Sequence, residues 1–390
     1  MGLKFEPLGK YIRLVDERNT DMITESVLGI NIDKNFMPSV ANVIGTDLSK
    51  YKLLRKDRFA CNPMHVGRDG RLPVSRYTED FPAIVSPAYF MFEIIDETEI
   101  SPEYLMLCFR RPDFDHMCWF RTDASVRGGV TWEDVCELTI PVPSIDQQRK
   151  IVYDYQVISD RIVLLRKLNE KLSAMGICFL QSLKAKDESK GCKWEEQTVG
   201  YWVSLGYIDS PVDGNHGEVH PKASDYVSSG VPFVMANNLI DGFVDYSSCA
   251  FITEKQTNTL RKGFSKPRDV LLTHKATIGR TAIVSREYDT TILTPQVTYY
   301  RVKKNISPDF LKYYFETSGF QQALKSFADA GSTRAYIGIT EQLKLPVVLP
   351  PKNTLELLTS VLRRIEVLRQ SNYLEIQRLK RLQILVANIT

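Results

Sequence analysis

Two stretches of the chain repeat apolar residues in alternating steps of four and three, with charged residues between them. This spacing is the heptad pattern of a coiled coil, in which the repeated apolar positions form a seam along one face of a helix. It predicts two long helices, at residues 145–188 and 352–390. The seam includes Ile158, Ile162, Leu165, Asn169 and Leu172 in the first helix and Ile365, Leu368, Asn372 and Leu379 in the second.

An asparagine interrupts both seams at the same place, because Arg161 and Asn169 match Arg364 and Asn372 at a constant separation. A buried asparagine costs stability unless it finds a polar partner, and it fixes register or orientation. Each helix ends one half of the chain. We therefore predict that the two helices pack on each other as an antiparallel coiled coil. Two separate amphipathic core helices are the alternative, although helices average only about 11 residues.

The rest of the chain consists of two halves that resemble each other. Residues 100–124 align with residues 306–330 without a gap, and both blocks begin with Ile-Ser-Pro, an acid and an aromatic residue. Ser101 and Ser307 are predicted helix N-caps, because each precedes a proline at the first helical position. The similarity indicates a duplicated domain.

Short runs rich in β-branched and aromatic residues precede the repeated block in each half and predict strands. They are ESVLGI, FACNP, AIVS and YFMFEI in the first half and VPFVMA, DVLLTH, TAIVS and VTYYRV in the second. The fold class is α+β, with two duplicated domains separated by two long helices. The predicted boundaries are 1–144 for the first domain, 145–188 for the central helix, 189–351 for the second domain and 352–390 for the last helix.

Composition excludes several classes of protein. The first residues, from Met1 to Tyr11, lack the apolar run of a signal peptide, and no stretch approaches the roughly 18 apolar residues of a membrane helix. The cytoplasm is therefore the expected compartment. The seven cysteines show no CxxC pairing, which predicts reduced, mostly buried thiols without disulfides or zinc.

Positive charge gathers in matching segments of the two halves, although the net charge is only +3. One basic stretch is usually a solvated face, whereas two at equivalent places favour phosphate contact. Neighbouring Asn, His and Thr side chains are of types that can also read base edges. The predicted DNA-contacting residues are Lys50, Lys52, Arg55, Asn62, His65, Arg68, Arg71, Arg76 and Arg127 in the first half, and Asn215, His216, Lys222, Asn237, Asn238, His274, Lys275, Thr277, Arg280 and Arg334 in the second.

His216 and His220 lie four residues apart, a spacing that would suit a metal on a helix. Gly217 and Pro221 argue against a helix at this place. We therefore expect this polar loop to contact DNA and expect no metal site.

The chain lacks the sequence motifs of an enzyme that acts on DNA by itself. The nearest approach to the catalytic turn of a methyltransferase is Asn62-Pro63-Met64-His65, which does not match, and no GxxxxGK[ST], GxSxG or HExxH motif is present. We expect no catalytic residues. A stand-alone DNA-modifying enzyme remains one alternative, and a coiled-coil adaptor that binds only proteins remains another.

With these features the chain resembles, over nearly its whole length, the DNA-specificity (S) subunit of type I restriction-modification enzymes. The resemblance rests on two domains of the target-recognition type, each followed by a long helix, on the proline-rich junction IPVPSIDQQRKI at residues 140–151, and on the stretch DVLLTHKATIGRTAIV. In one departure, Lys352-Asn353-Thr354 stands after Pro351, where the family has an acid-Gln pair.

The resemblance implies a non-catalytic protein in which each domain reads one half of a bipartite, asymmetric target in double-stranded DNA. The helices would set the spacer and dock two modification (methyltransferase) subunits, with restriction (motor-nuclease) subunits joining where they are encoded. No cofactor is expected on this chain. S-adenosylmethionine, ATP and Mg would belong to the partner subunits. The bases that are read do not follow from the sequence.

Overall fold

The structure is a computed structural model that describes residues 4–40, 44–64, 66–122, 129–217, 219–303, 306–328 and 336–388. The chain divides into two compact units. The first unit comprises Met1–Val163 and Ile376–Thr390, and the second comprises Leu164–Glu375. Each unit therefore holds one of the duplicated halves and part of each long helix. Within the described residues, no helix is long and apolar enough to cross a membrane.

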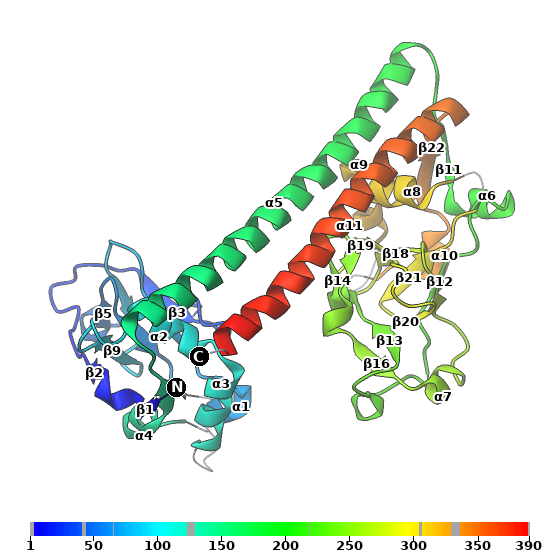
Figure 1. Ribbon diagram of the computed structural model, residues 1–390. Helices are drawn as coiled ribbons and strands as arrows, with labels where there is room; N and C mark the ends of the chain where they lie inside the picture. The colour runs from blue at the N-terminus through cyan, green and yellow to red at the C-terminus, as the bar shows by residue number, and fades with distance from the viewer. Residues whose placement is uncertain are drawn as a thin grey trace. The chain divides into compact units, whose positions relative to one another are not determined.

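Two four-stranded sheets form the first unit (Figure 1). One sheet is antiparallel, with the order β2-β9-β6-β7, and the other has the order β4-β3-β8-β5, in which β3 and β8 are parallel. A separate antiparallel pair joins β1 to β10, just before the central helix. The strands are β1 (Phe5–Pro7), β2 (Ile12–Leu14), β3 (Val27–Ile30), β4 (Phe36–Pro38), β5 (Lys52–Leu54), β6 (Phe59–Cys61), β7 (Val74–Arg76), β8 (Ala83–Val85), β9 (Phe90–Ile94) and β10 (Thr139–Pro141).

The second unit repeats this topology strand for strand. Its sheets have the orders β12-β21-β18-β19 and β16-β13-β20-β17, again with one parallel pair, β13 and β20, and β11 pairs with β22. It also has a hairpin, β14 with β15, that has no counterpart among the described strands of the first unit. The strands are β11 (Glu195–Thr198), β12 (Val212–Asp213), β13 (Val231–Val234), β14 (Leu239–Ile240), β15 (Phe243–Val244), β16 (Ala250–Ile252), β17 (Phe264–Ser265), β18 (Val270–Thr273), β19 (Thr281–Ile283), β20 (Thr291–Leu293), β21 (Val297–Tyr300) and β22 (Pro346–Leu349).

The repeated block forms equivalent helices in both units, as its N-caps predicted. The Ser101 hydroxyl accepts a hydrogen bond from the Tyr104 amide at 3.2 Å, and the Ser307 hydroxyl accepts one from the Phe310 amide at 3.4 Å. The first unit contains α1 (Val66–Asp69), α2 (Pro102–Phe109), α3 (Pro112–Phe120) and α4 (Trp132–Glu137). The second contains α6 (Val199–Ser204), α7 (Glu254–Thr257), α8 (Pro308–Phe315), α9 (Ser318–Ala328) and α10 (Ile339–Gln342), and 3-10 turns lie at Leu8–Lys10, Leu48–Lys50, Ala223–Asp225, Ala236–Asn238 and Tyr246–Ser248.

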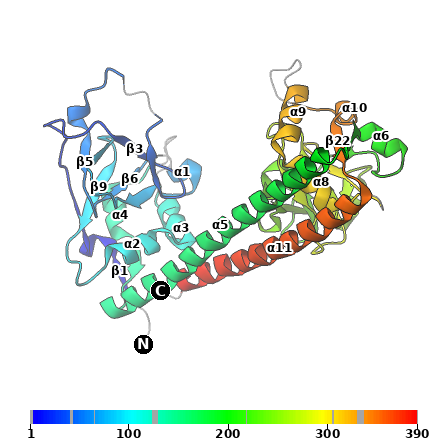
Figure 2. The ribbon, with the colours of Figure 1, turned by 90° about the horizontal axis from the view of Figure 1, so that it is seen from above.

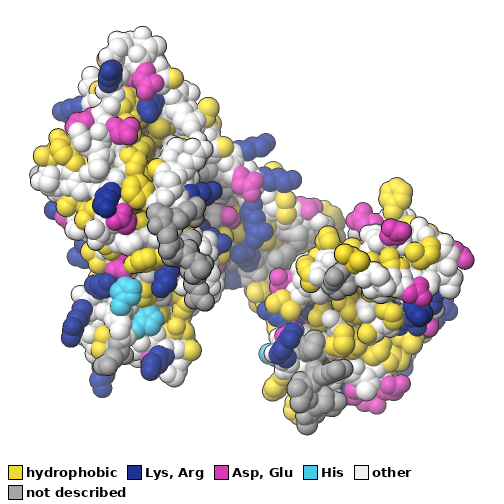
Figure 3. All heavy atoms as spheres, turned by 180° about the vertical axis from the view of Figure 1, so that it is seen from behind, with side chains coloured by type: hydrophobic (Ala, Val, Ile, Leu, Met, Phe, Trp, Pro, Cys, Tyr) yellow, Lys and Arg dark blue, Asp and Glu magenta, His cyan; other side chains and the backbone are white. Residues whose placement is uncertain are grey.

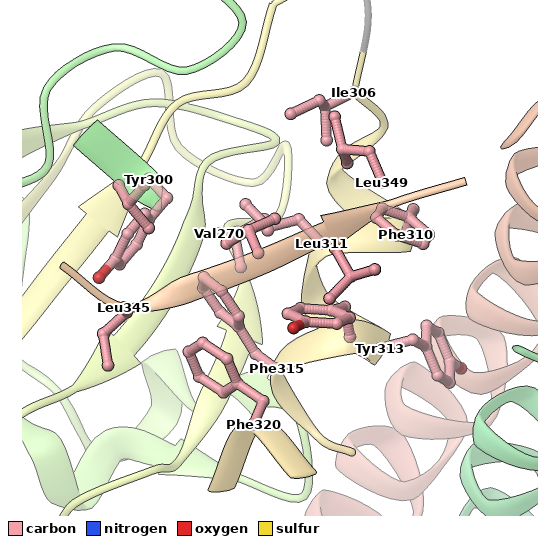
Figure 4. Packing of buried hydrophobic residues seen from close by; sticks show 14 of the residues in the cluster. Val270, Tyr300, Ile306, Phe310, Leu311, Tyr313, Phe315, Phe320, Leu345 and Leu349 are labelled. Atoms are coloured by element: carbon pink, nitrogen blue, oxygen red, sulfur yellow. The ribbon is translucent and has the colours of Figure 1, made fainter. Parts of the chain in front are cut away.

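The largest core of the second unit lies around α8. Phe315 and Phe320 stack with ring centroids 4.3 Å apart, and Tyr300 packs edge-on against Phe315 (Figure 4). Leu358 and Leu362 from the last helix belong to the same buried cluster. Apolar burial at this junction therefore attaches the second domain to the helix that follows it.

The two long helices are α5 (Ile145–Ser189) and α11 (Lys352–Asn388). They lie side by side and antiparallel, as both ribbon views show (Figures 1 and 2). In the second unit the Thr354 hydroxyl donates to Asp187 at 2.8 Å, and in the first unit the Gln383 amide donates to the Ser159 hydroxyl at 2.6 Å. The antiparallel coiled coil is confirmed. Ile158, Ile162, Leu165 and Ile365 are buried in it, and Leu172 and Leu379 are half-buried.

The paired asparagines meet within the second unit. Asn169 is buried and donates to the Arg369 carbonyl at 3.2 Å, while its own side-chain oxygen accepts from the Asn372 amide at 2.9 Å. Each amide thus has the polar partner that a seam position requires.

Leu368 was expected in the seam, and this prediction is wrong. Leu368 is 55 % exposed, and its neighbour Arg369 is buried instead. The reason is that α11 packs against the second domain as well as against α5. Its buried face is therefore wider than a heptad seam, and it includes Arg369, which is paired with Glu366.

The cysteines only partly match the expectation of mostly buried thiols. Cys61, Cys108 and Cys118 are buried. Cys178 on α5 and Cys192 just after it are exposed. Burial raises the pKa of the Cys108 thiol to about 12, so this side chain remains protonated and inert.

Candidate nucleic-acid interface

The loop between β18 and β19 presents polar side chains on the surface of the second unit. Lys275, Thr277 and Arg280 are exposed. Gly279 adopts a φ of 92°, and a Cβ atom there would approach the Gln321 side chain to 2.2 Å. The Gln321 amide donates to the Gly279 carbonyl at 3.0 Å. A fixed backbone therefore carries two cations and a hydroxyl into solvent.

His274 belongs to the core below this loop. It is fully buried, its Nε2 donates to the Pro295 carbonyl at 2.9 Å, and its Nδ1 lies 3.0 Å from the Thr298 hydroxyl and 2.5 Å from the Gln342 amide. Burial lowers the pKa of His274 to about 4. A neutral imidazole with internal partners supports the loop and does not reach a base.

Three other predicted DNA-contacting residues are also buried and form hydrogen bonds inside their domains. Lys52 donates to the Tyr89 carbonyl at 2.7 Å, Asn215 accepts from the Arg261 amide at 3.3 Å, and Asn238 accepts from the Met235 amide at 2.8 Å. These interactions satisfy polar atoms inside the domains. Because they are buried, these residues and His274 are not part of the exposed surface.

Asp213 organises the polar loop that follows β12. Its carboxylate accepts from Lys262 and from Nε2 of His216, the latter at 2.7 Å. Burial opposes the ionisation of Asp213, but these two hydrogen bonds outweigh it and hold the pKa of the carboxyl below its ordinary value. Within the described residues, no group of three His, Cys, Asp or Glu side chains is placed to hold a metal ion.

Other exposed cations lie on the surface of the second unit. Figure 3 shows Lys and Arg side chains around two histidine side chains on one face of the unit. Asn237 at the start of the β14–β15 hairpin is also exposed. Considering described residues alone, no carboxylate pairs with any member of the following set: Lys222, Arg261, Lys266, Lys275, Arg280 and Arg286.

The corresponding cations of the first unit are paired. Arg55 donates to Glu17 at 2.8 Å, Arg68 to Asp69 at 2.7 Å, and Arg71 to Asp33 at 3.2 Å. Arg76 is only 16 % exposed and lies between Asp57 and Glu103, at 2.5 and 2.6 Å. Lys50 lies 3.4 Å from Asp47. Most of these carboxylates lie outside the basic stretch in the sequence. The charges within the stretch therefore do not reveal this pairing.

Of the remaining predicted DNA-contacting residues of the first unit, only Asn62 lies among the described residues. The Asn62 side-chain oxygen accepts from the Met64 amide at 3.1 Å, and the residue is partly exposed. His65 and Arg127, and Arg334 of the second half, lie outside the described residues.

A broad groove opens on the second unit beside the start of α11. Its volume is about 1380 Å³. Tyr201 and Leu205 on and after α6 line one side, and Val367 and Leu368 on α11 line the other. All four side chains are more than one-third exposed. The cations Lys193, Lys352, Arg363 and Arg364 border this groove. It was not anticipated from the sequence, because Leu368 was assigned to the helix seam.

No family model matches the chain, and no curated protein matches it. Among solved structures, the type I restriction-modification S subunit from M. genitalium is 12% identical, with a TM-score of 0.54 over 99% of this chain and 95% of that chain. The HsdS subunit from Thermoanaerobacter tengcongensis is 17% identical, with a TM-score of 0.40 over 99% and 96% of the two chains. The match to the M. genitalium protein spans both duplicated domains and both long helices. The chain therefore has the fold of the S subunit of type I restriction-modification systems.

Proposed function

We propose that this protein is the DNA-specificity subunit of a type I restriction-modification complex. The observation that carries the proposal is the S-subunit fold over nearly the whole chain, in which a recognition domain occurs twice and a long helix follows each copy. In this function each domain reads one half of a bipartite, asymmetric DNA target. The chain itself performs no chemistry.

The exposed loop of the second unit supports DNA contact. Lys275 and Arg280 have no carboxylate partner among the described residues, and phosphate neutralisation by such side chains supplies most non-specific DNA affinity. Thr277 between them can hydrogen-bond to a base edge. Arg68 aligns with Arg280 and is 66 % exposed, so it is the equivalent contact in the first half.

The groove beside α11 supports the docking of a modification subunit. Exposed apolar surface that is bordered by charge marks a protein interface. On the same helix pair, Leu164, Leu168 and Met175 of α5 are each more than 40 % exposed. A methyltransferase that docks there would bring S-adenosylmethionine to the complex. ATP and Mg would come with a motor-nuclease subunit.

Sequencing of the methylated bases tests this function. We expect that the chain, expressed with modification subunits from the same source, directs methylation to one bipartite sequence with a fixed spacer. Modification subunits without this chain should not methylate that sequence. Methylation by the chain alone would identify an enzyme, and a stable complex that never binds DNA would identify an adaptor.

The length of the helix pair is proposed to set the spacer. One extra heptad after Lys171 keeps the apolar seam in phase and lengthens α5 by about 10 Å. The preferred spacer should then grow by up to about three base pairs. A folded variant that methylates the original spacer with its original preference would show that other features set the distance.

A further inference from the structure

A cluster of buried charges lies where α8 meets α11 in the second unit. Lys312 is fully buried, and its Nζ lies 3.3 Å from both Glu316 and Glu366. Arg369 donates to Glu366 at 2.9 Å, and the Tyr313 hydroxyl donates to the same oxygen at 3.2 Å. Burial opposes the ionisation of Glu366, but the two cations hold the pKa of its carboxyl below the ordinary value. The cluster thus holds two cations and two carboxylates.

From this cluster, Arg369 reaches the β14–β15 hairpin. Its Nη2 donates to the Asp241 carbonyl at 2.6 Å, at the turn of the hairpin. Its guanidinium lies 4.9 Å from the centre of the Phe243 ring, which stacks on Tyr373 of α11 at 4.7 Å. The hairpin is therefore fastened to α11 by a hydrogen bond, a cation–π contact and a ring stack.

The same hairpin holds Arg280. Nη1 of Arg280 donates to the Leu239 carbonyl of β14 at 3.3 Å. Arg280 is therefore linked to α11 through the hairpin, with Arg369 at the other end of the link. This arginine belongs to the loop that we assign to DNA.

A second link runs through Glu316. Its Oε1 accepts from the Thr281 hydroxyl at 2.7 Å, and Thr281 directly follows Arg280. Its Oε2 accepts from the Ser173 hydroxyl of α5 at 3.2 Å. Glu316 thus links α5 to the start of β19, and Lys312 connects it to Glu366 of α11.

The first unit builds the same fold without this cluster. In the ungapped alignments, Met106 takes the place of Lys312, Arg110 that of Glu316, and Val163 that of Glu366. Buried ion pairs contribute little net stability over apolar residues of similar volume. The fold does not need the cluster, so its presence in one copy points to the geometry that it fixes.

We propose that Glu366 and Arg369 are positioning residues for the second recognition domain. They fix Arg280 and its loop relative to α11, so that the selectivity for the second half of the target depends on them and the selectivity for the first half does not. This inference rests on the proposed function, because it assumes that the loop reads DNA.

The test uses the complete complex of this chain with its modification subunits. The probes are duplexes that carry the methylated target with one half-site altered at a time. The measured quantity is the ratio of methylation rates on the intact and altered duplexes. Arg369→Lys keeps the charge beside Glu366, but a single amine cannot also replace the fork that reaches the Asp241 carbonyl. We expect about tenfold weaker discrimination at the second half-site, within the range of one base contact, and unchanged discrimination at the first.

A second variant keeps the test decisive if Arg369→Lys does not fold. Lys312→Met with Glu366→Gln removes one cation and one carboxylate together and introduces the methionine found at the equivalent place in the first unit. It should also impair the second half-site alone. The matched control is Lys34→Met with Asp115→Asn, which removes the buried 2.7 Å ion pair of the first unit and should leave the second half-site unchanged.

Each outcome has a distinct meaning. If wild type methylates a bipartite target and a folded cluster variant keeps wild-type discrimination at the second half-site, the positioning role is wrong and the proposed function stands. Equal losses at both half-sites would show a merely structural cluster and would also overturn the inference. If the wild-type complex shows no bipartite target, the proposed function fails and this inference fails with it.

Discussion

The two units attach the same recognition fold to a long helix by different chemistry. In the first unit, Gln148 near the start of α5 is fully buried, accepts from the Ser101 amide at 2.9 Å, and donates to the Glu99 and Pro143 carbonyls at 2.8 and 2.9 Å. In the second unit, the corresponding contacts near the middle of α11 are ionic, because Arg369 donates to the Glu366 carboxylate at 2.9 Å. Duplication preserved the strand order and the apolar core, while the polar junction diverged in each copy.

The two units also differ in whether the cations of their basic stretches are paired with carboxylates. Arg55, Arg71 and Arg76 of the first unit are paired with carboxylates, whereas Lys275 and Arg280 of the second lack such partners among the described residues. A paired arginine must give up a carboxylate to bind phosphate. The second unit should therefore supply the larger electrostatic share of DNA affinity, even though the two basic stretches look alike in sequence.

The largest expected effect comes from breaking the charge cluster of the second unit. Lys312→Met alone leaves the carboxylates of Glu316 and Glu366 with one cation between them. Removal of one partner from a buried ion pair costs about 3–5 kcal/mol. Urea unfolding followed by hydrogen exchange should show this loss in the second unit. The double change Lys312→Met with Glu366→Gln should recover much of the lost free energy of unfolding. A loss of less than about 1 kcal/mol in the single variant would contradict a buried, ionised cluster.

Gln148→Ala is the matching test in the first unit. The change leaves the buried Ser101 amide and two carbonyls without their side-chain partner, and a buried unsatisfied group costs about 1–3 kcal/mol. We expect the stability of the first unit to fall by about 2 kcal/mol while the second unit is unchanged. Thermal unfolding with a probe in each unit measures this. An equal change in both units would show that the two junctions are not independent.

Much of this comparison could be predicted from the sequence, because local signals decide it. The eight predicted strand runs all contain strands, both serines cap their helices, and the two asparagines meet. These elements depend on spacing and propensity within a few residues.

The missed features depend on partners that are remote in sequence. Asp33 and Glu103 neutralise arginines of the first basic stretch from outside it, so counting charges along the chain gave the wrong balance. The β14–β15 hairpin has strands of two residues, too short for a periodic signal. From the sequence, Arg369 is indistinguishable from an exposed arginine on a helix. Only the fold shows that it contacts Asp241 and Glu366.

The stability of the two units should also differ in its dependence on pH. His274 has a folded pKa of about 4, below its ordinary value of 6.5, because it is buried. The unfolded chain therefore binds the proton more readily, and stability is lost as the pH falls from about 6.5 towards 4. Between pH 7 and 5 the second unit should lose about 2 kcal/mol. His274→Gln should flatten this dependence, and a steep fall that persists in this variant would point to another group.

The first unit should respond to acid at lower pH. A hydrogen bond from Lys10, with others from Lys4 and Tyr11, lowers the pKa of Glu6 from 4.5 to about 2. Its stabilisation is present above pH 4.5 and is lost as the pH falls towards 2. Hydrogen exchange at pH 5 should therefore show the second unit loosened and the first unit intact.

The smallest expected effect concerns single phosphate contacts. Each neutralised phosphate contributes about 0.9 to the slope of log affinity against log salt. Arg280→Gln removes a cation without a described carboxylate partner, so it should flatten the slope by nearly this amount. Arg68→Gln removes a cation that Asp69 already binds at 2.7 Å, so it should flatten the slope by less. Titration of target DNA at several salt concentrations measures both slopes, with exposed Lys186 at the end of α5 as the control position for Lys186→Gln. Equal changes for Arg68 and Arg280 would show that DNA displaces Asp69 at little cost, and the difference in charge pairing between the two units would then have no part in binding.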